Sequence, residues 1–251
     1  MRTATLATWT AAATIAVACA APDPGAAAPD DAAARARIET IVASADRSDA
    51  DLKNDVRRKP VDLLVFAGVR PGMTVLDVSA GGGYTTELLA RAVAPGGRVY
   101  AQTPRPPSPL LAARLQKPVA ADVTSVVRPF ESAPPPEGAG KLDLVTLMFN
   151  YHDMGHLGVD RARLNAAVFA ALKPGGSYVI ADHSGRAGTG ISESGTLHRV
   201  EEALVRREVE AAGFRLVAEG TFLRNPSDPR DRQEPDPPQP KDEFVLRFVK
   251  P

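Results

Sequence analysis

The residues with the clearest chemical potential stand in a short block, Asn-Tyr-His-Asp-Met-Gly-His (150–156), which follows an apolar run of strand length. A histidine can act as a general base near neutral pH, and a neighbouring acid can orient its imidazole ring. Another histidine, in Ala-Asp-His-Ser-Gly, ends a later apolar run. We predict catalytic roles for Tyr151, His152, Asp153 and His183. The alternatives are a helix-capping aspartate and histidines that form only structural hydrogen bonds.

The same block carries two histidines four residues apart with an acid between them, which is the spacing of a metalloprotease zinc helix. Asp153, however, replaces the glutamate that such sites use as a base, and Gly155 interrupts the helix that would align His152 with His156. We therefore expect no metal site. A fourth histidine, His198, begins an amphipathic helical pattern and is predicted to be structural.

A second block, VLDVSAGGGYTTELLA (75–90), joins an apolar run that ends in an acid to three glycines and the start of a helix. Because glycine has no Cβ, such a turn lets a ligand reach the main chain where a strand of an open α/β sheet ends. The dinucleotide fingerprint needs a further glycine where this chain has Thr86. The pattern disfavours an NAD-dependent oxidoreductase. Two alternatives stay open: such an oxidoreductase, and a structural turn that binds no ligand.

Composition predicts a globular domain with a single core, since 44% of the 251 residues are hydrophobic and 24% are charged. The 30 Lys and Arg residues balance the 30 Asp and Glu residues. A chain without net charge has no long-range field that would gather phosphate backbones, so we expect no nucleic-acid partner.

The first residues have the pattern of an export signal: Arg2 precedes a weakly apolar run, and small residues then lead into proline and glycine. The run is shorter than the ~20 residues of a membrane-spanning helix. We predict a cleaved signal segment (1–19), a flexible linker (20–30) and export to the periplasm or cell envelope. Cys19, the only cysteine, resembles the lipidated residue of a bacterial lipoprotein. Two outcomes stay open for this residue: it carries a lipid that tethers the protein to the membrane, or it is removed together with the signal segment.

From residue 31 onwards, helical and strand patterns follow one another. Two helical stretches, 31–44 and 59–69, precede the first strand. Apolar runs of strand length then alternate with helical stretches, which indicates βαβ units and a parallel sheet. The last two apolar runs, 214–223 and 243–250, are joined by a Pro-rich connector without a helix. We predict that they pair as an antiparallel hairpin at the edge of the sheet.

These blocks, in this order, resemble the class I S-adenosylmethionine (SAM) dependent methyltransferases. The resemblance rests on VLDVSAGGGYTTELLARAVAPGGRVYA, LDLVTLMFNYHDM, ALKPGGSYVIADHS and the terminal hairpin. The stretch LHRVEEALVRREVEAAGF resembles, more narrowly, a group of exported predicted methyltransferases. The resemblance implies an α/β fold: a Rossmann-like, doubly wound, mostly parallel seven-stranded sheet with a C-terminal antiparallel hairpin. We expect that domain at 60–251, behind a helical cap at 31–59.

In that family, an acid at the end of the first strand and a G-x-G-x-G spacing receive the methionine and ribose parts of SAM. Asp77 is the matching acid. Gly81 and Gly83 hold the second and third glycine places, and Ser79 stands in the first.

The family also commonly ends its second strand with an acid that accepts both ribose hydroxyls. Here that place falls on Thr103, or on Gln102 in a register shifted by one. Loss of the charge-assisted pair lowers cofactor affinity by ~1–2 kcal/mol. Glu131 lies where the family often contacts adenine, with a solvated loop carboxylate as the alternative. The predicted cofactor-binding residues are Asp77, Ser79, Gly81, Gly83, Tyr84, Thr103, Glu131 and Asn150.

The resemblance implies a SAM-dependent methyltransferase that acts on a small molecule in the cell envelope. Methyl transfer is an in-line displacement, so the protein chiefly positions the acceptor and, where needed, removes its proton. Ser79 and Thr103 favour the alternative of a non-catalytic protein that keeps the fold to bind a small ligand. The sequence indicates neither the acceptor nor the oligomeric state.

Overall fold

The computed structural model describes residue 1, residues 29–235 and residues 238–251. Apart from Met1, the predicted signal segment, Cys19 and the predicted linker up to residue 28 lie outside the described residues. The first helix, α1 (Pro29–Val42), begins inside the range predicted as linker. None of the described helices is long and apolar enough to cross a membrane.

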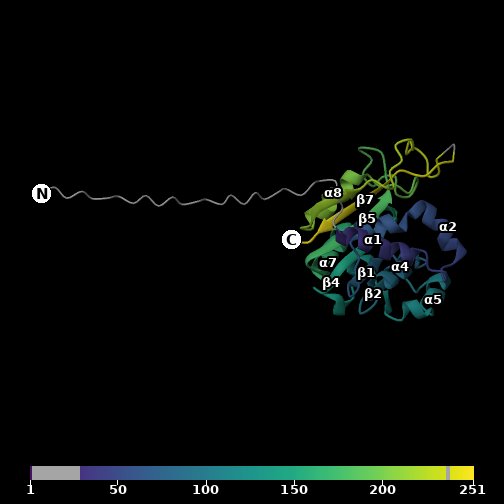
Figure 1. Ribbon diagram of the computed structural model, residues 1–251. Coiled ribbons are helices and arrows are strands. Elements are labelled where there is room, and N and C mark those ends of the chain that lie inside the picture. Colours follow the sequence, from purple (N-terminus) through teal and green to yellow (C-terminus); the bar gives the residue numbers. More distant parts are fainter. Residues whose placement is uncertain (2–28, 236–237) are drawn as a thin grey trace.

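Seven strands of the described chain form one sheet in the order β3-β2-β1-β4-β5-β7-β6 (Figure 1). Strands β1 to β5 run parallel, and β7 pairs antiparallel with both β5 and β6. This confirms the predicted mostly parallel sheet with a C-terminal antiparallel hairpin, whose outer strand is β6. The strands are β1 (Thr74–Val78), β2 (Arg98–Thr103), β3 (Val123–Val127), β4 (Leu142–Met148), β5 (Leu172–His183), β6 (Arg215–Gly220) and β7 (Glu243–Val249).

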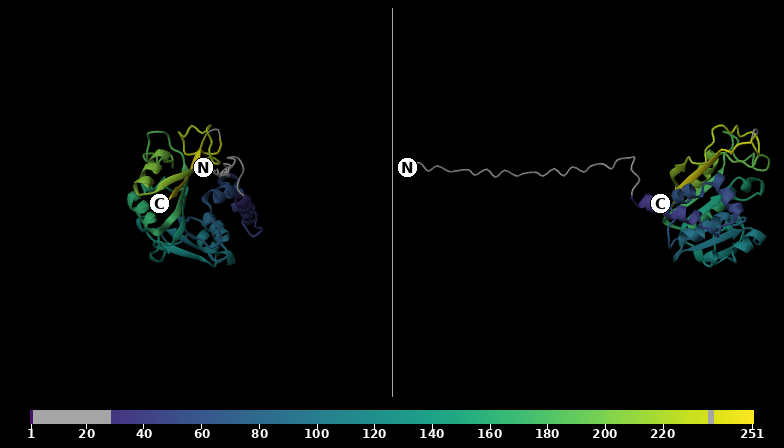
Figure 2. Two further views of the ribbon diagram at one scale, coloured as in Figure 1. Left: turned by 60° about the vertical axis from the view of Figure 1, so that its left-hand side comes forward. Right: turned by 45° about the vertical axis from the view of Figure 1, so that its right-hand side comes forward.

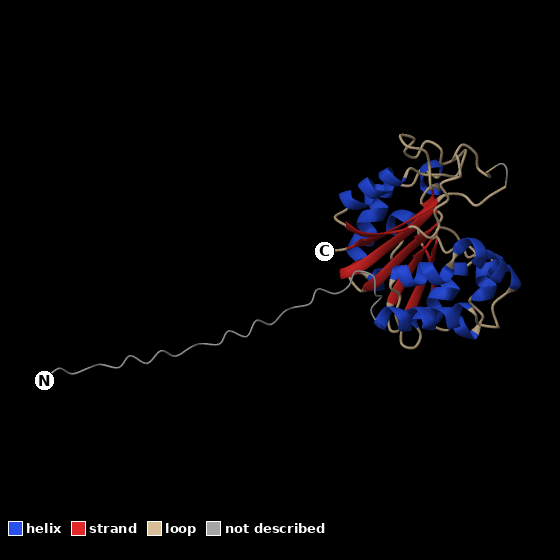
Figure 3. Ribbon diagram, turned by 45° about the horizontal axis from the view of Figure 1, so that its top comes forward, coloured by secondary structure: helices blue, strands red, loops and turns tan. Residues whose placement is uncertain are grey.

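Helices cover both faces of the sheet (Figure 3). Helices α1, α3 and α4 contribute to the core on one face, and α7 and α8 to the core on the other. Figure 2 shows the purple N-terminal helices and the green C-terminal ones on opposite sides. The further α-helices are α2 (Asp49–Arg58), α3 (Pro60–Ala67), α4 (Tyr84–Val93), α5 (Pro109–Arg114), α6 (Asp153–His156), α7 (Arg161–Ala171) and α8 (Glu202–Ala211). Short 3-10 helices are η1 (Pro118–Ala120), η2 (Phe130–Ser132) and η3 (Pro136–Gly138).

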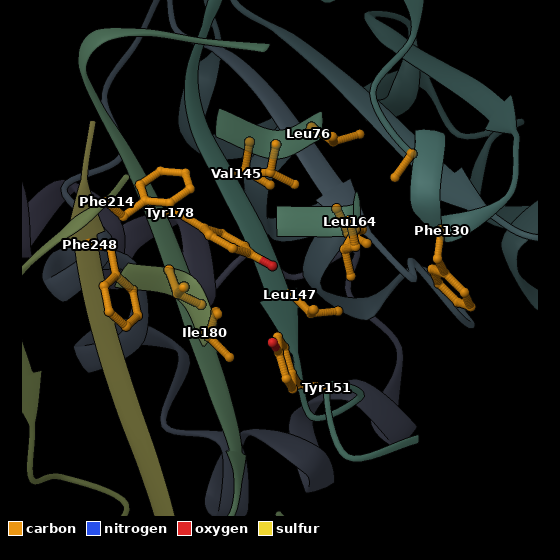
Figure 4. Close-up of a cluster of buried hydrophobic side chains, with 14 of the residues drawn as sticks. Leu76, Phe130, Val145, Leu147, Tyr151, Leu164, Tyr178, Ile180, Phe214 and Phe248 are labelled. Carbon is orange, nitrogen blue, oxygen red and sulfur yellow. The ribbon is translucent and has the colours of Figure 1, made fainter. Parts of the chain in front are cut away.

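Alternating side chains of the strands supply the two cores, because successive residues of a strand point to opposite faces. In β4, Val145 and Leu147 belong to the core under α7 and α8, whereas Leu144 belongs to the core under α1, α3 and α4. Figure 4 shows the first of these cores, in which Tyr178 packs against Phe214 with ring centroids 5.6 Å apart. With both faces covered, a ligand reaches the sheet at the ends of its strands.

The N-terminal cap contains a helix, α2, that the sequence pattern did not predict. Its two large apolar residues, Leu52 and Val56, are 44% and 81% exposed, so apolar packing does not hold it against the domain. Ser48 caps its first turn by accepting the N–H of Asp51, and its last turn is basic. With only two large apolar residues among ten, this helix leaves a weak hydrophobic pattern in the sequence, which is why it was missed.

Ion pairs attach α2 to the domain instead. The guanidinium of Arg114, on α5, binds both carboxylate oxygens of Asp51 at 2.5 and 2.7 Å and one oxygen of Glu87 at 2.7 Å. Its Nε also donates to the carbonyl of Gly82. The side chains of Arg114, Asp51 and Glu87 are only 9%, 7% and 4% exposed. One buried cation therefore connects the cap, α4 and the glycine turn.

We expect Arg114→Met to lower the free energy of unfolding by ~3–5 kcal/mol, because it leaves the buried carboxylate of Asp51 without its cation. The matched control is Lys173→Met. Lys173 pairs with Asp143 at 2.6 Å but is 46% exposed, so its loss should cost less than ~1 kcal/mol. Urea denaturation followed by circular dichroism measures both values. Equal, small losses in the two variants would contradict the role assigned to Arg114.

Candidate functional site

The candidate site lies at the carboxyl ends of the strands, where the strand order reverses between β1 and β4. Loops that leave such neighbouring strands diverge and open a crevice. A pocket of about 370 Å³ occupies this position. The structure brings five of the sequence-predicted site residues together in its lining, and adds His156 to them. These residues are Ser79, Gly81, Thr103, Asn150, Asp153 and His156.

Ser79 begins the glycine-rich turn in a left-handed conformation (φ 60°) that a non-glycine residue rarely adopts. Its N–H donates to Oε1 of Gln102 at 2.9 Å, and its hydroxyl donates to Oδ1 of Asn150 at 2.5 Å. The main-chain carbonyl of Gln102 also accepts the N–H of Ala80. These bonds hold the serine in the first glycine place and tie the turn to the ends of β2 and β4.

Thr103 is the last residue of β2 and lines the pocket, whereas the side chain of Gln102 is engaged in holding the turn. The hydroxyl oxygen of Thr103 is buried and has no hydrogen-bond partner among the described residues. A buried hydroxyl without a partner is unfavourable. Two residues were considered for the ribose position, Gln102 and Thr103. Of these, Thr103 is the one whose side-chain polar atom has no partner among the described residues.

The two predicted glycines differ in what surrounds them. A Cβ on Gly81 would meet only the carbonyl oxygen of Ser79, at 3.8 Å, so its main chain is accessible from the pocket that it lines. A Cβ on Gly83 would lie 2.8 Å from Leu111 and 2.9 Å from Arg114. Gly81 is therefore placed to let a ligand approach, and Gly83 is needed for the packing of α4 against α5. Both have positive φ angles, 57° and 82°, which glycine adopts readily.

Asp77 is buried at the end of β1. The hydroxyls of Thr86 and Thr146 donate to its two carboxylate oxygens at 2.6 and 2.9 Å. Burial raises the pKa of Asp77 to about 6, against these two hydrogen bonds and the more distant charge of Arg58, which all lower it. At neutral pH the site therefore holds a buried negative charge that a cationic ligand would stabilise.

Two predicted cofactor residues have other partners. The hydroxyl of Tyr84 donates to Oδ1 of Asp55 at 2.5 Å, and burial raises the pKa of this hydroxyl. Asp55 in turn accepts two hydrogen bonds from Arg47, so Tyr84 helps to fasten α2. Glu131 accepts the N–H of Asp160 at 3.1 Å. Neither Tyr84 nor Glu131 belongs to the described lining of the 370 Å³ pocket.

His152 is buried between two carboxylates. Its Nδ1 lies 2.6 Å from Oδ1 of Asp182, and its Nε2 lies 3.1 Å from Oδ1 of Asp153. Burial disfavours the charged ring, but the charge of Asp182 and the hydrogen bonds to both aspartates outweigh it and raise the pKa of His152 to about 9. An imidazolium cannot accept a proton, so in the free protein this geometry suits charge stabilisation better than general-base chemistry.

The other three histidines of the chain lie around His152 and its two carboxylates. The rings of His183 and His198 lie 5.3 and 5.6 Å from that of His152, and His156 lies 5.6 Å from His198. Nδ1 of His183 is 2.9 Å from Oε1 of Glu243, and burial lowers the pKa of His183. Sequence reasoning missed His198 and Asp182 as site residues. The signal available in the sequence for these residues was the small number of histidines, four in all.

Tyr151 lies away from the pocket, in the core beneath α7 and α8 (Figure 4). Its hydroxyl donates to Oε2 of Glu208 at 2.7 Å and accepts from Nδ2 of Asn165 at 3.0 Å. Burial raises the pKa of this hydroxyl. The structure therefore separates Tyr151 from the other predicted catalytic residues.

Helix α2 brings two cations next to Phe149, which the sequence did not predict. The guanidinium of Arg58 lies 4.3 Å from the ring centroid of Phe149, directly after β4, and that of Arg57 lies 4.9 Å from it. Arg57 also pairs with Glu243 at 2.6 Å. Burial lowers the pKa of Arg58 to about 10, and its Nε has no hydrogen-bond partner within the described part of the chain. The cap therefore presents positive charge beside the buried Asp77.

No protein-family model matches the sequence of this chain. The protein-L-isoaspartate O-methyltransferase of Aeropyrum pernix is 66% identical over 39 residues, which are 16% of this chain and only 15% of that protein. A match of this length does not show a family, so the relationship depends on the three-dimensional structure.

Solved structures match over most of the chain. A SAM-dependent methyltransferase from Aquifex aeolicus has a TM-score of 0.60 and 19% identity, covering 86% of this chain and 98% of its own. The 1,6-didemethyltoxoflavin-N1-methyltransferase of Burkholderia thailandensis, solved with bound 1,6-didemethyltoxoflavin and S-adenosylhomocysteine, has a TM-score of 0.54 and 20% identity, covering 91% of this chain and 93% of its own. The cyclase SpnF has a TM-score of 0.59 and 17% identity, covering 77% and 82%. The described chain thus has the Rossmann-like fold of the class I SAM-dependent methyltransferases.

Proposed function

We propose that the protein is a SAM-dependent methyltransferase that acts on a small molecule in the cell envelope. The observation that carries the proposal is the pocket at the switch point of a methyltransferase fold. There the main chain of Gly81 is accessible and the buried hydroxyl of Thr103 has no partner in the described chain.

The residues of the pocket fit SAM. Gly81 leaves room against the main chain, and Thr103 offers a hydroxyl for one ribose hydroxyl. Asp77 is buried outside the described lining and supplies a negative charge that favours a cationic ligand. When bound, SAM supplies an electrophilic methyl group on a sulfonium. The carboxylate of Asp77 is held in place by Thr86 and Thr146, so its charge has a fixed position behind the glycine turn.

The histidine cluster borders the same pocket, since Asp153 and His156 line it. We assign to this cluster the positioning of the methyl acceptor. Asp182 orients His152 through Nδ1 and through the main-chain N–H, at 2.6 and 2.7 Å. The pocket, at about 370 Å³, has the size of a small-molecule site.

A non-catalytic binding protein is the second candidate. The observations that favour it are the neutral Thr103 at the ribose position and the strained Ser79, which is bonded to Asn150 in the lining of the pocket. An NAD-dependent oxidoreductase is disfavoured because Thr86, at the third fingerprint position, is bound to Asp77. Calorimetric titrations with S-adenosylhomocysteine and with NAD separate the three candidates.

The envelope location rests on the N-terminal sequence and has its own test. We expect the protein in its native host to begin at or just after Cys19 and to carry a lipid if that cysteine is the tether. Mass spectrometry of the protein from fractionated cells measures this. A cytosolic protein that retains Met1 would contradict the location and leave the proposed reaction untouched.

We expect two substitutions of Thr103 to change affinity for S-adenosylhomocysteine in opposite directions. Thr103→Asp provides a bidentate, charged acceptor and should tighten binding by roughly tenfold. Thr103→Val removes the hydroxyl and should weaken binding by roughly tenfold, while it stabilises the free protein by about 1 kcal/mol because an unpaired buried hydroxyl is lost. Calorimetry and urea denaturation measure these effects. The control is Thr124→Val, at an exposed position of β3, which should alter neither quantity. If the parent and the three variants bind S-adenosylhomocysteine equally, the ligand does not contact Thr103.

The raised pKa of Asp77 predicts a pH effect. Since the pKa is about 6 in the folded protein against an ordinary value of 3.8, folding favours the protonated acid. Stability should therefore fall as pH rises from 4 to 6 and level off above. Asp77→Asn removes this loss and should stabilise the free protein by roughly 2–3 kcal/mol at pH 8, while it weakens S-adenosylhomocysteine binding.

The control for this effect is Asp143→Asn, at a carboxylate that is bound by Lys173 and by the N–H of Thr74. That change should give no stabilisation at pH 8. Denaturation curves at pH 5 and pH 8 are the measurement. A destabilised Asp77→Asn protein at pH 8 would mean that its hydrogen bonds outweigh the buried charge.

A further inference from the structure

All four histidines of the chain gather at one place, although they come from separate segments. His152 and His156 follow β4, His183 ends β5, and His198 lies in the segment before α8. Asp153 stands among them. Ring nitrogens of His152, His156 and His198 lie 3.1, 3.8 and 3.2 Å from Oδ1 of Asp153, whereas His183 faces Glu243.

The donor atoms around Asp153 have the separations of metal ligands. Its Oδ1 lies 3.1 Å from Nε2 of His152 and 3.2 Å from Nδ1 of His198. The three ligand atoms all lie within 4.8 Å of one another. Around a tetrahedral Zn²⁺ with bonds of ~2.0–2.1 Å, neighbouring ligand atoms are about 3.3 Å apart. Small side-chain movements would therefore complete the coordination.

The surroundings orient these donors. Asp182 accepts from His152 at Nδ1, which directs Nε2 toward Asp153, and a carboxylate behind a histidine is the usual outer partner of a metal ligand. Asn150 donates to Oδ2 of Asp153 at 2.6 Å and thereby leaves Oδ1 for the cluster. Two of the three donors thus have a second group that fixes their direction.

The third donor is held by a strained main chain. His198 has φ 51°, a left-handed conformation that is unfavourable for a residue with a Cβ. The next residues are pinned to the end of β5: the N–H of Val200 donates to the carbonyl of His183, and Gly185 donates back to Val200. Such strain persists where the surroundings impose it, and here its effect is to bring the His198 ring to Asp153.

We propose that His152, Asp153 and His198 bind one divalent transition-metal ion of the zinc type. Two imidazoles and a carboxylate are a donor set for such ions, whereas Mg²⁺ and Ca²⁺ need mostly oxygen ligands. Three protein ligands leave one coordination position open, as in catalytic zinc sites. The partly exposed His198 and Asp153, at 36% and 21%, provide the path of entry. The sequence spacing had paired His152 with His156, and we had expected no metal site from it. In the structure, Nδ1 of His156 faces Oγ of Ser194 at 3.0 Å, and His198 is the second histidine at Asp153.

The inference goes beyond the proposed methyl transfer and does not depend on it, because metal binding is measured without SAM. The full chain, stripped of metal by a chelator, is titrated with Zn²⁺ by calorimetry and with Co²⁺ by visible absorption. We expect one equivalent of each to bind, with the intense Co²⁺ bands of a tetrahedral site, and no binding of Mg²⁺ at millimolar concentration.

Variants separate this site from adventitious binding. His198→Ala should weaken Zn²⁺ binding by more than about a hundredfold, and Asp182→Asn by about 10- to 100-fold through the orientation of His152. His183→Gln is the matched control, since the His183 ring is as near to His152 but faces Glu243, and it should bind Zn²⁺ as the parent does. His198→Gly should in addition raise the unfolding midpoint of the metal-free protein, because the strain is relieved.

The proposal is overturned if the parent binds no Zn²⁺ at micromolar concentration, or if His198→Ala and the parent bind it equally. Circular dichroism confirms that each variant is folded. Saturable Zn²⁺ binding without S-adenosylhomocysteine binding would keep the metal site and refute the methyltransferase proposal. The reverse result would refute the metal site alone.

Discussion

The buried carboxylate of Asp77 is the group on which the geometry of the site depends. It lies near the end of β1, and its two oxygens are bound by Thr86 of α4 and Thr146 of β4. Because Asp77 also stands opposite Thr146 in the β1–β4 pairing, it fixes the glycine turn relative to both strands that open the crevice. Burial makes this charge unfavourable in the free protein. It lies, however, where a cationic ligand would stabilise it.

Helix α2 of the cap is held by charge rather than by apolar packing. Arg114 joins Asp51 of α2 to the glycine turn, and Arg47 and Tyr84 meet at Asp55. These ion pairs decide the orientation of α2, and that orientation brings its basic last turn over Phe149. The cap therefore places two cations next to the residue that follows β4.

The strand ends carry carboxylates and histidines. Glu243 of β7 connects them to the cap, since its Oε1 lies 2.6 Å from Arg57 and 2.9 Å from His183. Methyltransferases and a cyclase share this fold, so the sheet by itself does not select a reaction. The chemistry depends on the segments at the carboxyl ends of β4 and β5, and there this protein concentrates its histidines beside Asp153 and Asp182.

The sequence by itself determined the features that local pattern encodes. The strands, α4, the glycine turn with Asp77 and the terminal hairpin were predictable, because burial on alternating or helical positions leaves a periodic record in the chain. Only the tertiary structure decided the partners of polar side chains. Arg114 meets Asp51 across 63 positions and His198 meets Asp153 across 45, and no local pattern records such pairs. For the same reason Tyr84 was found on Asp55 and Tyr151 on Glu208, since a hydroxyl binds whichever polar group the fold brings within reach.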